Sequence, residues 1–325
     1  MSDLVETREA QAEPVDEPAR TPGRRTARKA GSERPAWKEK PRAITQVAKG
    51  AVLLLTVAMV LIPFWVVLAT SLAPGQQIID SGGWALWPES WTLDSYSKVL
   101  SSEVTTRALM VSVGVTVTGT LFSLVCTVML AYALARPGVV GGKPVMLVIL
   151  FTFLFPPGFI PTYLVLDTLG LIDTYWSLFL PVTVNVFNLV VVRGFFQGIP
   201  EELYEAARLD GAGELRTLLT IVLPLSKAVI AVVGLFYAVG YWNDFFRGVM
   251  YINDTSMFPL QTVLRGYVSR GEGLASEMSV EGTVTQAPQA MKMAVVMIAT
   301  IPILCVYPFI QRYFTKGVLT GAIKS

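Results

Sequence analysis

The chain has 325 residues, of which 53% are hydrophobic and only 15% are charged, and its mean hydropathy is +0.54. This composition is too apolar for a soluble domain and is typical of a protein that crosses a membrane several times. The sequence contains no histidine, which excludes histidine-based catalysis and metal binding. Cys126 and Cys305 fall within apolar runs and are interpreted as packing residues rather than as a disulfide.

The N-terminal region, residues 1–47, is rich in Glu, Arg, Pro, Ala and Ser, which predicts a disordered tail. Nine lysines and arginines lie within residues 24–49. A cleaved signal peptide is the competing interpretation, because this basic stretch precedes an apolar one. The basic region of such a signal peptide would be far too long, and its apolar core would exceed the usual length. The first apolar run is therefore predicted to be an uncleaved anchor, and residues 48–325 to form one membrane domain.

Six apolar runs are long enough to cross a bilayer as helices, which takes about 20 residues. In chain order the predicted spans are residues 51–73, 108–135, 144–166, 174–192, 217–243 and 293–311. The third contains Phe155-Pro156-Pro157-Gly158, which predicts a broken or bent helix lining protein or a water-filled cavity. The fifth is interrupted by Lys227, whose side chain could reach the interface from near a helix end.

Basic residues predict the orientation, since cytoplasmic loops carry an excess of lysine and arginine. With six alternating spans the basic clusters fall on one side: the N-terminal run, Arg136 with Lys143, then Arg193, Arg208 and Arg216, and finally Arg312, Lys316 and Lys324. The segment between the third and fourth spans has no lysine or arginine. The fold class is therefore predicted to be an all-α membrane protein with six transmembrane helices and both termini in the cytoplasm.

Two long segments are then expected outside the cell. Residues 74–107 contain Trp84, Trp87 and Trp91, an aromatic cluster suited to the interface or to packing over the outer mouth. Residues 247–291 mix Gly, Ser, Glu and Gln and could contact an external partner. Interfacial anchoring, or plain connection, is the alternative for both segments.

The cytoplasmic loop between the fourth and fifth spans, residues 197–222, predicts a capped helix. Pro200 suits the first helical position, and Glu201 and Glu205 lie in the first turns, where the helix dipole favours negative charge. Gly211 is expected to end the helix without Cβ strain.

One face of this predicted helix is small and apolar. Leu203, Ala206 and Ala207 recur at i, i+3 and i+4. Because the side chains of the two alanines are short, the backbone of another protein could approach this face closely. The alternative is an amphipathic helix that simply lies on the membrane surface.

The spacing in the loop extends further: Glu-Ala-Ala, three residues, Gly, nine residues, Ile, one residue and Leu-Pro. This pattern resembles the cytoplasmic signature of the permease subunits of binding-protein-dependent ABC importers, over roughly residues 45–325. The continuation Asp210-Gly211-Ala212, the run Tyr241-Trp242-Asn243-Asp244 and the run from Tyr307 to Phe314 are similar to the second permease of maltose-type carbohydrate importers. Within that branch the chain is most similar to permeases for complex oligosaccharides, including uronide-containing ones.

The resemblance implies the type I ABC importer permease architecture, in which this loop is a coupling helix that docks on a cytoplasmic ATPase. Glu205 would pair with a basic residue of the ATPase, Ala206 and Ala207 would allow close seating, and Gly211 would set the turn. The expected coupling residues are Glu201, Glu205, Ala206, Ala207, Asp210, Gly211, Leu223 and Pro224.

The resemblance also implies partners and a location. They are an ABC ATPase dimer, a second permease subunit, an extracytoplasmic solute-binding protein, a sugar substrate and the lipid of a bacterial plasma membrane. No cofactor, metal or nucleic acid is expected.

A sugar requires hydrogen-bonding partners and aromatic faces within the membrane. The fourth span offers Asn185 and Asn188, which are predicted to share one helix face, and the fifth offers Tyr237, Trp242 and Asn243. We expect these residues near the translocation path. Hydrogen bonding between helices is the alternative for each of them.

The sequence lacks a Walker phosphate loop, a Gly-rich dinucleotide turn and a metal-ligand cluster. The chain is therefore predicted to be non-catalytic, with ATP hydrolysed by another chain. A permease for another solute, an ion-coupled secondary transporter and a membrane enzyme are the alternatives. A secondary transporter normally needs an ionisable residue within a span, whereas Lys227 and Asp244 lie only at the ends of one.

Overall fold

The computed structural model describes residues 43–270 and 288–322, and the chain divides into two units, residues 1–56 and 57–325. Within the described residues the first unit consists of the beginning of helix α1 (Ala43–Leu72). This helix starts inside the stretch predicted to be a tail, since residues 43–47 continue the helix toward the N-terminus. The rest of the predicted tail, with most of its basic run, lies outside the described residues.

Helix α1 exposes apolar side chains on all sides. Leu54, Met59 and Phe64 are all exposed, and burial begins only at its end, with Ala69 and Thr70. A helix that is hydrophobic all round belongs in an apolar environment, here a lipid bilayer.

The segment after α1 contains two short helices, α2 (Gly75–Asp80) and α3 (Asp94–Ser101). Trp65 of α1 meets Trp87 and Trp91 with ring centroids 5.5 and 6.5 Å away. The indole N–H of Trp65 also donates to the carbonyl of Leu86 at 2.9 Å. An aromatic cluster therefore forms at this segment, and Trp65 rather than Trp84 completes it.

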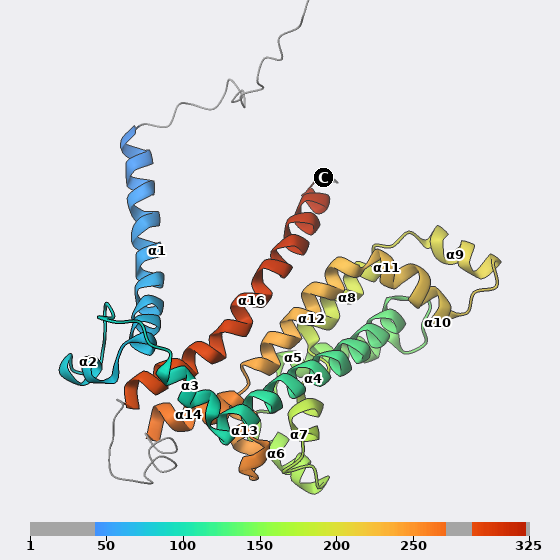
Figure 1. The fold of residues 1–325 in the computed structure, drawn as a ribbon. Helices are drawn as coiled ribbons and strands as arrows, with labels where there is room; N and C mark the ends of the chain where they lie inside the picture. The colour runs from blue at the N-terminus through green and yellow to red at the C-terminus, as the bar shows by residue number, and fades with distance from the viewer. Residues whose placement is uncertain (1–42, 271–287, 323–325) are drawn as a thin grey trace, which may run out of the picture. The chain divides into compact units, whose positions relative to one another are not determined.

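Helix α4 (Glu103–Ala135) is the central helix of the second unit. It packs against α12 (Lys227–Trp242) and α8 (Val186–Gln197) (Figure 1). Gly119 permits a close approach of α4 to α12, because a Cβ atom there would lie only 2.8 Å from the ring of Tyr241.

The third predicted span is broken as expected. Helices α5 (Gly142–Leu154) and α6 (Phe159–Thr168) meet at 119° around the Pro156-Pro157-Gly158 turn. Prolines lack the amide hydrogen of a helix interior, and Gly158 adopts a φ of +81°, so the helix cannot continue.

The fourth predicted span is not one straight helix. It comprises α7 (Trp176–Phe179), a 3₁₀ turn η1 (Leu180–Val182) and α8, with a bend of 53°. The backbone of Asn185 is extended between the two parts, and its side chain caps α8.

The loop that follows holds α9 (Glu201–Leu209) and α10 (Glu214–Thr217), and leads into a π-helical turn η2 (Leu218–Val222) and α11 (Leu223–Leu225). The predicted fifth span is therefore divided, because the chain bends by 88° at Ser226 before α12 begins. Pro224 cannot donate the backbone hydrogen bond of a continuous helix. Lys227 is the first residue of α12 and is exposed, as its predicted place near a helix end requires.

The last described elements are α13 (Phe246–Tyr251), η3 (Thr255–Met257), α14 (Leu260–Arg270) and α16 (Pro288–Ala322). Helix α16 packs against α12, α3 and α14. The predicted outer segment 247–291 thus contains short helices, and its residues 271–287 lie outside the described residues.

In the described part of the chain three helical stretches can each cross a membrane by length and hydropathy: Ala43–Leu72, Glu103–Ala135 and Gln289–Val306. The three bent pairs complete a set of six when each is counted as one span. These same residues contain no strand. The fold class is an all-α membrane protein, as predicted.

Candidate coupling loop and translocation cavity

Helix α9 has well-defined ends. Pro200 is the N-cap rather than the first helical residue, and Glu201 lies in the first turn. At the other end Gly211 has a φ of +72°, its N–H donates to the carbonyl of Arg208, and the N–H of Ala212 donates to that of Ala207. This pair of hydrogen bonds is a Schellman motif, so the predicted glycine cap is confirmed.

Helix α9 has one buried side and one exposed side. Tyr204 and Ala207 are buried, whereas Leu203 and Ala206 are exposed. Two residues of the predicted small apolar face, Leu203 and Ala206, are thus accessible to a partner, and the third, Ala207, packs within the chain. Tyr204 lies on the buried side, and its O–H donates to the carbonyl of Phe196 at 3.4 Å.

A single arginine, Arg136 at the end of α4, holds the loop from the inside. Its guanidinium lies 4.2 Å from the centre of the Tyr204 ring, within the range of a cation–π interaction. Its Nη2 donates to Glu214 Oε1 at 3.0 Å, and the Tyr132 O–H donates to Glu214 Oε2 at 2.5 Å. We call these four residues, Tyr132, Arg136, Tyr204 and Glu214, the arginine clamp.

The clamp is buried on one side and exposed on the other. The Arg136 side chain is only 11% exposed, but its partner Glu214 is 62% exposed, so the charge pair reaches water on one side. Burial raises the pKa of the Tyr204 hydroxyl, and the nearby Arg136 opposes that rise. The hydroxyl therefore stays neutral, and the loop is fixed to α4 by one cation, one carboxylate and two aromatic rings.

The opposite face of the loop is open. Glu205, Ala206 and Asp210 are exposed, and Leu209 is 89% exposed although it is a large apolar residue. Within the described residues Glu205 makes no ion pair. The remaining predicted coupling residues, Leu223 and Pro224, form α11, where Leu223 is half-buried and Pro224 exposed.

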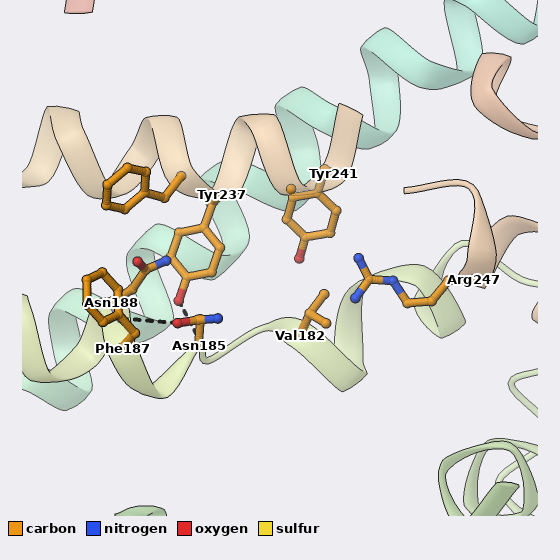
Figure 2. Close-up of a pocket in the computed structure, with 9 residues that line it drawn as sticks. Val182, Asn185, Phe187, Asn188, Tyr237, Tyr241 and Arg247 are labelled. Atoms are coloured by element: carbon orange, nitrogen blue, oxygen red, sulfur yellow. Dashed lines mark hydrogen bonds between the residues drawn. The ribbon is translucent and has the colours of Figure 1, made fainter. Parts of the chain in front are cut away.

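A cavity of about 520 Å³ lies between α8 and α12 (Figure 2). Its lining combines aromatic rings, amides and one cation: Val182, Asn185, Phe187, Asn188, Phe236, Tyr237, Gly240, Tyr241 and Arg247. Three of the five residues predicted for the translocation path, Asn185, Asn188 and Tyr237, are thus brought together.

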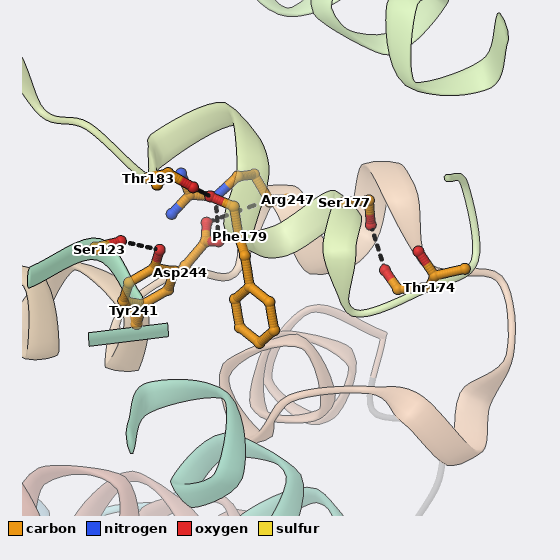
Figure 3. A network of polar contacts seen from close by, with 8 residues as sticks. All are labelled: Ser123, Thr174, Ser177, Phe179, Thr183, Tyr241, Asp244 and Arg247. Atoms are coloured by element: carbon orange, nitrogen blue, oxygen red, sulfur yellow. Dashed lines mark hydrogen bonds and ion pairs between the residues drawn. The ribbon is translucent and has the colours of Figure 1, made fainter. Parts of the chain in front are cut away.

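Two tyrosine hydroxyls fasten α12 to α4 behind this cavity. The Tyr237 hydroxyl is hydrogen-bonded to Thr127 Oγ1 at 2.6 Å and accepts the N–H of Asn185 at 2.9 Å. One turn along, the Tyr241 hydroxyl is hydrogen-bonded to Ser123 Oγ at 2.7 Å (Figure 3). Both hydroxyls are therefore engaged within the protein.

The two asparagines both line the cavity, although only Asn188 lies within α8. Asn185 is the N-cap of α8, and its side-chain oxygen accepts the N–H of Asn188 at 3.1 Å. Asn188 is 3% exposed and lines the cavity, yet its side-chain amide makes no hydrogen bond within the described part of the chain.

Trp242 and Asn243 lie elsewhere. The indole N–H of Trp242 donates to the carbonyl of Ala299 at 2.9 Å and so joins α12 to α16. The side chain of Asn243 donates to the carbonyl of Val239 at the end of α12. Neither residue lines the cavity. Trp242 joins two helices, and Asn243 caps the end of α12.

Arg247 and Asp244 form an ion pair at the cavity rim (Figure 3). Nε of Arg247 and its backbone N–H both donate to Asp244. The carboxylate does not line the cavity, whereas the guanidinium does. Among the described residues no group of His, Cys, Asp and Glu could hold a metal ion.

The structure combines membrane-crossing helices with a capped surface loop and an open cavity lined by aromatic rings, amides and one cation. Residues 120–320 match the family described as "Binding-protein-dependent transport system inner membrane component", and the chain belongs to this family. It is therefore a multi-pass plasma-membrane component of a binding-protein-dependent transport system.

Two relatives from Bacillus subtilis are each 43% identical to this chain. They are the "Polygalacturonan/rhamnogalacturonan transport system permease protein YtcP", over 84% of this chain and 95% of that protein, and "Protein LplC", over 82% and 90%. Among solved structures, a bacterial ABC transporter involved in the import of the acidic polysaccharide alginate is 26% identical, with a TM-score of 0.79 over 85% of this chain and 99% of that one. This likeness establishes the type I permease fold.

Sequence reasoning missed the groups that hold the site together. Arg136 served only to predict orientation, although its position at the end of a span opposite the loop was a usable signal. Arg247 was overlooked because it follows the predicted end of the fifth span. Ser123 and Thr127 gave no signal, since small hydroxyl residues are common within membrane helices.

Proposed function

We propose that this chain is the permease subunit of an ATP-driven importer that carries an oligosaccharide into the cell. The observation that carries the proposal is the two-sided loop. Its inner face is fixed to α4 by the arginine clamp, while its outer face exposes Glu205, Ala206 and Leu209, which no other described residue covers. An exposed carboxylate beside exposed apolar groups suits a protein partner.

The partner on this face is a separate ATPase. In the described residues α9 is a short, rigid, capped helix, and a rigid element is what a motor domain needs to move a membrane helix. Glu205 pairs with a basic residue of the ATPase, and Ala206 allows its backbone to approach closely. Closure of two ATPases around ATP then moves the loop, and α4 moves with it through Arg136.

The substrate occupies the cavity between α8 and α12. Aromatic rings supply faces for sugar rings, and the amides of Asn185 and Asn188 supply donors and acceptors for hydroxyls. The named substrates of two similar transporters, polygalacturonan/rhamnogalacturonan and alginate, are polysaccharides. A second permease faces this chain across the path, and an extracytoplasmic binding protein delivers the sugar.

Uptake in a strain that lacks the chromosomal copy tests the proposal. Glu205→Arg and Gly211→Val are expected to abolish oligosaccharide uptake and ATPase co-purification, while membrane insertion persists. Glu89→Arg, at an exposed position in the outer segment, is the matched control and should transport normally. Normal uptake and ATPase co-purification with both loop variants would overturn the coupling assignment.

An ion-coupled transporter can be distinguished from an ATP-driven importer by its energy source. Uptake should stop when cellular ATP is depleted and continue when an ionophore collapses the ion gradient. The reverse result would favour a secondary transporter.

A further inference from the structure

We propose that Arg247 is the residue that recognises the carboxylate of an acidic sugar in the cavity between α8 and α12, and thereby sets the charge specificity of transport. The inference rests on the proposed function, in which this cavity takes the saccharide. It adds the chemical class of the sugar unit and the residue that selects it.

The lining of the cavity carries one positive charge and no negative one. Of its nine lining residues, Arg247 is the one that carries a charge. Its side chain is 18% exposed, and its paired Asp244 lies outside the lining. A ligand in the cavity therefore meets the guanidinium rather than the carboxylate.

The free end of the guanidinium faces the cavity. The Asp244 carboxylate accepts hydrogen bonds from Nε–H and from the backbone N–H of Arg247. In the described part of the chain Nη1 and Nη2 make no hydrogen bond. Figure 2 shows these terminal nitrogens directed toward Tyr241 and Val182, into the cavity. Two parallel N–H groups of this kind form the fork that binds a carboxylate through both of its oxygens.

Asp244 makes such a site possible before the ligand arrives. An unpaired charge would be costly in this surrounding, and the ion pair offsets that cost. Because Asp244 takes only one edge of the guanidinium, the cation is held in place with its fork still available.

The rest of the cavity fits the other parts of a uronic acid. The side-chain amide of Asn188 is almost fully buried, faces the cavity and has no partner in the described residues. It can therefore bond a sugar hydroxyl that enters. The rings of Phe187 and Phe236, with centroids 6.2 Å apart, supply apolar faces beside it.

The alternative is that Arg247 and Asp244 only fasten the turn before α13. The two accounts differ for Asp244→Asn. A structural pair predicts that this variant loses uptake of every sugar. Carboxylate recognition predicts that it still takes up acidic sugars in preference to their esters, because Arg247 remains in the lining.

The experiment uses the complete transporter in proteoliposomes, with both permeases, the ATPase and the binding protein. The probes are trigalacturonate and its methyl ester, which differ in the carboxylates alone, and the readout is the ratio of their uptake efficiencies. Arg247→Gln should lower the acid-to-ester ratio on the order of tenfold or more, since a desolvated charge pair is lost. Arg247→Lys should give an intermediate ratio, because the charge remains and the fork does not.

Arg265→Gln is the matched control, since Arg265 is a neighbouring cation over the ring of Phe245 that does not line the cavity. Its ratio should equal that of the wild type. An unchanged ratio for Arg247→Gln, or a wild type that transports only the ester, would overturn the inference and leave saccharide import standing. A wild type that transports no saccharide at all would overturn the proposed function itself.

Discussion

The coupling loop and the cavity are both attached to α4, but by different chemistry. At the loop, the charged side chain of Arg136 on α4 contacts the carboxylate of Glu214 and the ring of Tyr204. At the cavity it uses neutral hydroxyls, those of Ser123 and Thr127, which meet the tyrosines of α12.

The difference follows from the surroundings. Charge is expensive in the apolar interior of a membrane and cheap at its edge, so ion pairs gather where water reaches them and hydroxyl pairs serve deeper in the bundle. Because one helix carries both kinds of attachment, motion of the loop can reach the cavity through a single rigid element. The following variants test that comparison, from the largest expected effect to the smallest.

Arg136→Gln should have the largest effect. It removes the ion pair with Glu214 and the cation over the Tyr204 ring, so the loop is no longer fixed to α4. Oligosaccharide uptake per ATP hydrolysed should fall roughly severalfold, because a half-exposed ion pair and a cation–π contact are lost together. Transport and ATP hydrolysis are measured together in proteoliposomes, and the acid-to-ester ratio should stay at its wild-type value. A changed ratio with intact coupling would contradict the division between the two regions.

Gly119→Ala tests the close contact between α4 and α12. The added Cβ would meet the buried ring of Tyr241, so the ring must shift and its hydrogen bond to Ser123 must stretch. Overpacking of this kind destabilises by about 1–3 kcal/mol. Thermal unfolding of the purified complex measures the loss. Gly114→Ala, on the same helix with open space around its Cβ position, is the control and should unfold as the wild type does.

Tyr237→Phe removes one hydroxyl and leaves both of its partners, Thr127 Oγ1 and the Asn185 N–H, without it. We expect a loss of about 1 kcal/mol in stability. The double variant with Thr127→Val should lose less than the sum of the two single variants, since the two groups share one bond. Additive losses would show that the hydroxyl pair does not couple the helices.

Tyr204→Phe should have the smallest effect. The ring stays under Arg136, and only a long hydrogen bond to the Phe196 carbonyl is lost. We expect roughly 0.5 kcal/mol or less, with coupling preserved. Tyr204→Ala, which also removes the ring, should impair coupling as Arg136→Gln does. Equal, severe effects of both variants would assign the main role to the hydroxyl instead.

The sequence was sufficient for features that depend on local chemistry. The break at Pro156-Pro157-Gly158 and the glycine cap at Gly211 were predictable, because proline and glycine restrict the backbone wherever they stand. The membrane class followed from composition. The bend at Ser226 was missed, since the apolar run continues through it and hydropathy does not register backbone geometry.

The missed site residues depend on tertiary contacts. Tyr204 turned inward because Arg136 lies beneath it, and no periodicity within α9 encodes that partner. Trp242 was expected near the path, but an indole N–H in an apolar bundle needs an acceptor, and Ala299 of α16 supplies it. The role of Arg247 could not be predicted from the sequence, because it depends on which edge of the guanidinium Asp244 occupies.

The most direct test of the account is photocrosslinking from the loop. A photocrosslinking amino acid at Leu209, on the open face of the loop, should capture the ATPase in intact cells, and ATP binding should change the yield. The same amino acid at Leu86, which is 70% exposed in the outer segment, should not capture it. Capture from both positions, or from Leu86 alone, would contradict the assignment of this loop as the link between ATP hydrolysis and transport, and so would the absence of capture from Leu209.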